Sequence, residues 1–162
     1  MVREEALWKA LETVTDPEIP SLSVVEMGMI KRVEAEGREV RVEVRPTFVG
    51  CPALDIIRRD IHGALSAVEG VQSVEIRFVH DPPWSPEEIS PTGKEKLRQF
   101  GIAPPVSCSG DAPLTQVDEV PPCPYCGSTD THMENLFGPT ACRFICYCNG
   151  CQQPFEAMKS LR

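Results

Sequence analysis

The fold of this chain is decided by residues 40–78, which read VRVEVRPTFVGCPALDIIRRDIHGALSAVEGVQSVEIRF. The first six residues alternate between apolar and charged side chains, which is typical of a strand with one buried face. From Pro52 the apolar residues take helical spacing until Gly70, and alternation then returns up to Phe78. A strand, a helix and a strand in this order predict a right-handed crossover between two parallel strands.

The flanking segments extend this unit to a small domain. Residues 3–14 carry an apolar stripe at helical spacing, and the segment Asp16-Pro17-Glu18-Ile19-Pro20 ends the helix. Glu36-Gly37 supplies a turn between two strands. We therefore predict an α+β domain over residues 1–101, ordered helix-strand-strand-helix-strand, with a mixed sheet and its helices on one face. Proline-punctuated residues 81–101 hold one short final helix that ends at Gly101.

Two further segments follow this domain. Residues 102–120 are rich in proline and lack periodicity, which predicts a linker. The remaining residues, 121–162, are too few for an ordinary core and need disulfides, a metal or a partner to fold.

Seven of the eight cysteines follow residue 107. Cys123-Pro124-Tyr125-Cys126 and Cys148-Asn149-Gly150-Cys151 are two Cys-x2-Cys pairs, a spacing that aims two sulfurs at one tetrahedral ion. We predict a zinc ribbon over residues 121–162, with a hairpin that returns the second pair. Four thiolates are also compatible with iron, and a redox dithiol is the alternative. The expected zinc ligands are Cys123, Cys126, Cys148 and Cys151.

Two more cysteines lie on the predicted returning strand. Cys142 and Cys146 share a face with Cys148, since alternate residues of a strand point the same way. These two cysteines could have an auxiliary role at the metal, or they could be buried as small apolar side chains.

The composition of the chain excludes several classes of function. The chain has 16 Lys and Arg against 24 Asp and Glu, a net charge of -8, which is the wrong sign for binding nucleic acid. There is no apolar segment of membrane-spanning length and no export signal. We therefore expect a cytoplasmic protein that binds neither membranes nor nucleic acid.

Cys51 stands apart from the other cysteines. It precedes Pro52 at the predicted start of a helix, where unpaired backbone N–H groups and the helix dipole favour a thiolate. Asp55 opposes this effect by its charge. Asp16 and Glu18 could supply oxygen ligands, although Asp-Pro sequences commonly form turns. No serine-protease triad, phosphate loop or zinc-protease motif occurs, so conventional hydrolase and nucleotide chemistry are not expected.

Several of these motifs resemble a known family. The segments DPEIP at residues 16–20, PTFVGCPA at 46–53 and PPW at 82–84 resemble the small iron–sulfur assembly domain of SufT-like maturation factors. The tail, FGPTACR at 137–143 followed by the second cysteine pair, is similar to the PaaD family of phenylacetate degradation. Together the resemblance covers nearly the whole chain.

The resemblance implies a non-catalytic maturation factor for the metal centres of a phenylacetyl-CoA oxygenase. It implies that Cys51 transiently holds iron or an iron–sulfur cluster, with Thr47, Asp16 and Glu18 in the adjoining motifs, and that zinc is structural. Because a cluster usually takes four protein ligands, a single cysteine implies a second copy or a client surface. The expected partners are oxygenase subunits or other iron–sulfur assembly proteins.

Two other functions remain open. The chain could be a structural adaptor bound to the oxygenase, with Cys51 incidental. It could also be a thiol oxidoreductase that uses Cys51, or Cys142 with Cys146.

Overall fold

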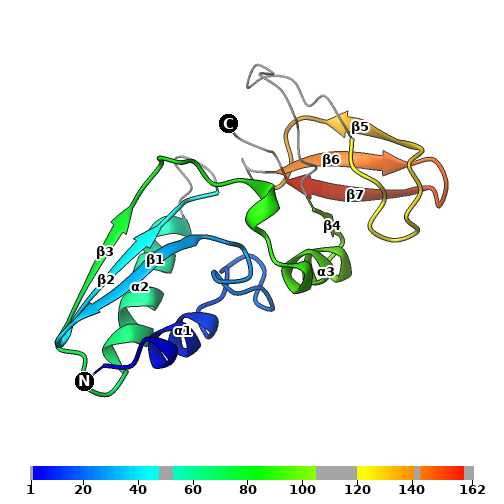
Figure 1. The fold of residues 1–162 in the computed structure, drawn as a ribbon. Coiled ribbons are helices and arrows are strands. Elements are labelled where there is room, and N and C mark those ends of the chain that lie inside the picture. The colour runs from blue at the N-terminus through cyan, green and yellow to red at the C-terminus, as the bar shows by residue number, and fades with distance from the viewer. Residues whose placement is uncertain (1, 48–52, 105–119, 141–142, 159–162) are drawn as a thin grey trace. The chain divides into compact units, whose positions relative to one another are not determined.

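The computed structural model describes residues 2–47, 53–104, 120–140 and 143–158. Contacts within the chain divide it into two compact units, Met1–Trp84 and Ser85–Arg162. Within the described ranges, no helix has the length and apolar character needed to cross a bilayer. The helices and mixed sheets confirm the α+β class (Figure 1).

The first unit has the predicted order of elements. It contains α1 (Glu4–Glu12), β1 (Ile30–Glu36), β2 (Glu39–Val44), α2 (Ala53–Ser66) and β3 (Ser73–Phe78). The sheet order is β1-β2-β3, with β1 antiparallel and β3 parallel to β2. The parallel crossover expected from residues 40–78 is therefore present.

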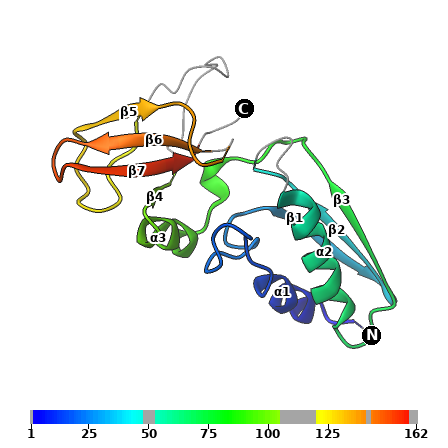
Figure 2. The same cartoon turned by 180° about the vertical axis from the view of Figure 1, so that it is seen from behind.

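One face of this sheet is apolar and the other is charged. Figure 2 shows α2 in front of the sheet, and α1 contacts both α2 and β1. The buried row of β2 consists of Val40, Val42 and Val44, as the alternation predicted. The opposite face carries exposed ion pairs, among them Arg41 with Glu75. The sheet thus buries one face only.

The segment between α1 and β1 is held by local hydrogen bonds. The hydroxyl of Ser23 accepts from the Glu26 N–H, and the Glu26 carboxylate accepts from the Ser23 N–H. Near the end of the unit, the buried Trp84 indole donates a 2.7 Å hydrogen bond to the carbonyl of Met27. Trp84 therefore attaches the end of the first unit to the segment before β1.

The second unit is larger than the predicted ribbon hairpin. It contains a short 3-10 turn (Pro86–Glu88), α3 (Pro91–Gln99), β4 (Ile102–Ala103), β5 (Thr131–Asn135), β6 (Arg143–Cys148) and β7 (Gln153–Met158). The sheet order is β4-β7-β6-β5, in which β4 is parallel to β7 and the other pairs are antiparallel. The β6–β7 hairpin carries the second cysteine pair.

The contacts place the domain boundary differently from the sequence. The sequence suggested a boundary at residue 101 and a linker over 102–120, whereas the contacts divide the chain after Trp84. α3 contacts β4, and β4 pairs with β7, so both belong to the sheet that carries the cysteines. Residues 105–119 of the predicted linker lie outside the described residues.

A close contact fixes the turn between α3 and β4. Gly101 has a φ of +82°, which favours glycine, and a Cβ built there would lie 2.5 Å from the Tyr125 hydroxyl oxygen. The Gly101 carbonyl also accepts from the Glu156 N–H. The turn is therefore held against both the first cysteine pair and β7.

We expect Gly101→Ala to lower the free energy of unfolding of the second unit by about 2 kcal/mol, from positive-φ strain and overpacking together. Denaturant unfolding measures this change. Tyr125→Phe, combined with Gly101→Ala, removes the hydroxyl oxygen nearest to the new Cβ. The double variant should therefore recover the part of the lost stability that is due to the steric clash. Equal losses in the single and double variants would contradict the contact.

Candidate metal centre

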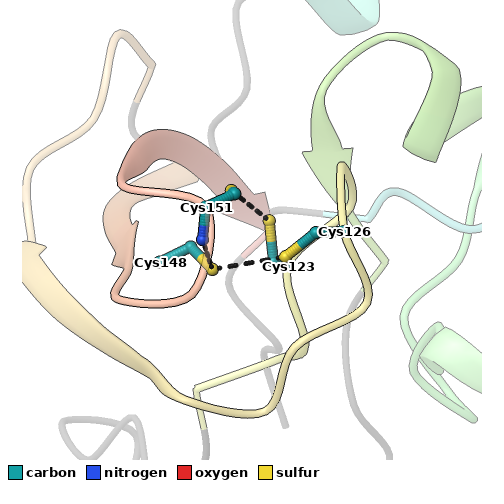
Figure 3. A group of neighbouring side chains, drawn as sticks. All are labelled: Cys123, Cys126, Cys148 and Cys151. Carbon is teal, nitrogen blue, oxygen red and sulfur yellow. Dashed lines mark hydrogen bonds between the residues drawn. The ribbon is translucent and has the colours of Figure 1, made fainter.

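Four cysteines come together from two loops of the second unit. Cys123 and Cys126 precede β5, Cys148 ends β6, and Cys151 lies in the turn before β7. Figure 3 shows the four side chains converging. The sulfurs of Cys123 and Cys151 are 3.7 Å apart, those of Cys126 and Cys148 are 3.5 Å apart, and all four lie within 4.8 Å of one another.

This geometry suits a tetrahedral metal ion. Zinc–sulfur bonds of about 2.3 Å in a tetrahedron place the sulfurs about 3.8 Å apart, close to the observed spacing. Four thiolates leave no open position for a substrate, so an ion held here supplies structure rather than chemistry. The donor set therefore fits a closed metal centre.

Local backbone geometry presents the first pair. Gly127 has a φ of +76°, and its N–H donates to the Cys123 carbonyl in a tight turn. The N–H of Tyr125 donates to the Cys123 sulfur over 3.4 Å. In the second pair the N–H of Cys151, three residues after Cys148, donates to the Cys148 sulfur over the same distance. Each Cys-x2-Cys turn thus stabilises its first thiolate.

The thiols differ in acidity. The N–H of Cys151 is the main cause that lowers the pKa of Cys148 to about 7. Loss of solvent around the sulfur raises the pKa of Cys151 to about 12, and the thiol of Cys123 adds to the rise. Since metal binding needs thiolates, a bound cation must supply the charge that ionises Cys151.

Cys146 lies in the core of the unit and outside this group of sulfurs. It is fully buried, in a cluster with Phe144 and Phe155. Burial also raises the pKa of Cys146 to about 12. This burial is typical of a cysteine that packs as a small apolar side chain. Cys142 lies outside the described residues.

The residues expected at the transfer site are described only in part. Cys51 lies outside the described residues, and α2 begins two residues after it, at Ala53. The Asp16 carboxylate accepts hydrogen bonds from the N–H groups of Glu18 and Ile19, at 2.8 and 3.3 Å. This is the turn-forming arrangement that an Asp-Pro sequence favours.

Backbone hydrogen bonds connect the segment that follows Asp16 and Glu18 to the strand that precedes Thr47. The N–H of Met29 donates to the carbonyl of Val24, and the N–H of Arg45 donates to the carbonyl of Met29. These bonds tie the segment after Asp16 to the end of β2. Thr47, partly exposed, follows β2 by three residues.

The sequence did not predict a hollow of about 300 Å³ beside the β6–β7 hairpin. Phe100 and Tyr125 line it, and the buried Arg143 pairs with Glu156 at 2.9 Å in its wall. These residues are far apart in the sequence and share no motif or periodicity, so the sequence alone does not predict that they line one hollow.

The fold and the four-cysteine site define a class of protein: an iron–sulfur assembly domain followed by a zinc ribbon. Residues 4–77 match the family model described as an iron–sulfur cluster assembly protein. Residues 109–159 match the model of the PaaD zinc beta ribbon domain.

A relative that aligns along nearly the whole chain identifies the family. This relative is a putative 1,2-phenylacetyl-CoA epoxidase component of Escherichia coli. The two are 34% identical over 158 residues, which cover 96% of this chain and 92% of the relative. The chain belongs to this PaaD family.

Other proteins resemble the first unit. An Fe-S protein maturation auxiliary factor of Porphyromonas gingivalis is 37% identical over 61% of this chain and 91% of its own length. A crystal structure of a domain of unknown function from Bacillus anthracis has a TM-score of 0.55 and 33% identity, covering 58% of this chain and 90% of its own. A conserved hypothetical protein of Thermotoga maritima has a TM-score of 0.53 and 35% identity, covering 62% and 95%.

The burial of the cysteines predicts their order of alkylation. In the native chain we expect iodoacetamide to leave the buried Cys146 unmodified, whereas the exposed Cys126 should react once a chelator has removed any bound metal. Peptide mass mapping over time measures both rates. In denaturant with chelator the two rates should converge, which serves as the control. Rapid modification of Cys146 in the native chain would contradict the assignment of Cys146 to the core.

Proposed function

We propose that this protein is an accessory factor that supplies iron or an iron–sulfur cluster to a phenylacetyl-CoA oxygenase. One observation carries the proposal. A single chain joins a domain matched by iron–sulfur assembly proteins to a ribbon matched by PaaD, and it aligns along its length with a putative epoxidase component. No catalytic step of the oxygenase is assigned to this chain.

In this proposal Cys51 is the transient ligand for the cargo. In the sequence Cys51 comes two residues before the start of α2, and a helix N-terminus favours a thiolate. The Asp16 carboxylate accepts both of its N–H hydrogen bonds at one oxygen, Oδ1, and the Glu18 side chain is exposed. Either carboxylate is therefore proposed as a second ligand, with the remaining positions filled by a client or by a small thiol such as glutathione. Thr47 would flank the site.

The ribbon is proposed to be a zinc-stabilised module that recognises the client. Cys123, Cys126, Cys148 and Cys151 are its proposed zinc ligands, and their spacing supports this assignment. A recognition module joined to a carrier domain raises the effective concentration of cargo at the client.

The two alternative functions, a structural adaptor and a thiol oxidoreductase, are not equally supported. A structural adaptor would fit the relative named as part of an epoxidase and would not need Cys51. A thiol oxidoreductase that pairs Cys142 with Cys146 is disfavoured by the burial of Cys146.

Metal analysis tests the ribbon assignment. We expect one zinc per chain in anaerobically purified protein, and we expect zinc to be lost as the pH falls because protons compete for the thiolates. Elemental analysis after dialysis at each pH measures this. Cys123→Ser should lose zinc, whereas Cys146→Ala, a cysteine outside the site, should keep it. Full zinc retention by Cys123→Ser would contradict the assignment.

Cys51→Ser tests the transfer function. In a phenylacetate-degrading host we expect this variant to lower the iron content and activity of the oxygenase by roughly tenfold or more, as loss of an essential metal ligand would. Iron and acid-labile sulfide bound to the purified chain should fall as well.

The matched control is Cys146→Ala, which removes a cysteine outside the proposed transfer site. Unchanged oxygenase iron in Cys51→Ser, with stoichiometric co-purification of the chain and the oxygenase, would overturn the carrier function in favour of the adaptor.

A further inference from the structure

The two sheets have four edge strands, and three of them are poorly suited to pairing. β1 has a register shift between Ile30 and Arg32, and β5 has one between Met133 and Asn135. Such bulges disrupt the regular row of backbone groups that another strand needs. The third edge strand, β4, has only two residues.

β3 differs from the other edges. It pairs with β2 over six residues, from Ser73 to Phe78, without a register shift. Among the described residues, no strand pairs with its other side. Its apolar side chains, Val74, Ile76 and Phe78, are only partly buried, although their neighbours in β2 are fully buried. β3 therefore offers both a regular backbone and an incompletely covered apolar row.

The sequence of β3 is complementary to itself in one register. In an antiparallel pair of two copies, the two Ile76 residues can lie opposite each other. Glu75 of each copy then lies opposite Arg77 of the other copy, which gives two opposite-charge pairs. The same register also places Val74 opposite Phe78, and aromatic with β-branched residues is a favourable cross-strand pair. Pairing about residue 75 or residue 77 would instead oppose two like charges. A shift by a single position would place apolar side chains opposite charged ones.

We propose that β3 is a self-association surface, on which a second copy of this chain pairs antiparallel about Ile76. The two-fold axis is perpendicular to the sheet, so both copies keep their helices on the same side of a continuous sheet of six strands. Glu75 already binds Arg77 of its own strand at 2.8 Å. In the dimer each of these charges gains an opposite charge across the new strand pair.

The charged side chains of the interface are exposed. The side chains of Glu75 and Arg77 are 48% and 65% exposed, so they are accessible to a second copy. Arg58 lies over the Phe78 ring, 4.8 Å from its centre, and covers part of this ring on the helix side. The backbone edge of β3 and the rest of its apolar row stay available for contact.

A charge-swap series in the full chain tests the interface. Sedimentation equilibrium over a concentration series should show a reversible dimer. Glu75→Arg should weaken it about tenfold, because two opposite-charge pairs become like-charge pairs. The swap Glu75→Arg with Arg77→Glu restores opposite charges in the same register and should restore dimerisation.

The matched control is Arg32→Glu on β1, which reverses an exposed charge that also pairs within its own strand, with Glu34, but lies on a bulged edge. It should leave the dimer unchanged. Amide hydrogen exchange of the wild type gives a second measurement, in which protection of residues 73–78 should rise with protein concentration. A chain that stays monomeric, a swap that folds but does not restore the dimer, or exchange independent of concentration would overturn the proposal.

Discussion

Four cysteine sulfurs lie within 4.8 Å of one another, and this crowding is the constraint on which the second unit depends. Two of them, Cys123 and Cys148, are also members of its apolar core, together with Cys146, Phe144 and Phe155. The candidate metal centre and the core therefore share two residues. A sheet with so small a core has few other means of offsetting its conformational entropy, which is why ribbons of this size depend on metal.

The sequence predicted those parts of the structure that depend on local pattern. Alternation and helical spacing over residues 40–78 were sufficient to predict the parallel pairing of β2 and β3. The two Cys-x2-Cys pairs predicted the cluster of four sulfurs. The pairing of β4 with β7 was not predictable, because two residues give no periodicity and their partners lie far along the chain. Alternation alone could not show that Cys146 is buried in the apolar core, because it places Cys146 on the same strand face as Cys148.

The Asp16 carboxylate has a structural role that the sequence motif alone does not show. Asp16 uses its carboxylate to hold the turn before Ile19, while the side chain of Glu18, one residue beyond the proline, is exposed. Sequence motifs do not distinguish these neighbours, since both are acidic and both flank Pro17. Only the direction of the backbone N–H groups shows that the Asp16 carboxylate holds the turn.

The buried Trp84 and the exposed Tyr125 have a consequence for spectroscopy. The chain has two tryptophans, Trp8 and Trp84, both in the first unit, and two tyrosines, Tyr125 and Tyr147, both in the second. Each unit therefore carries its own intrinsic chromophore. Tryptophan emission reports on the assembly-like domain, and tyrosine absorbance reports on the ribbon, so the melting of the two units can be followed separately in one unlabelled sample.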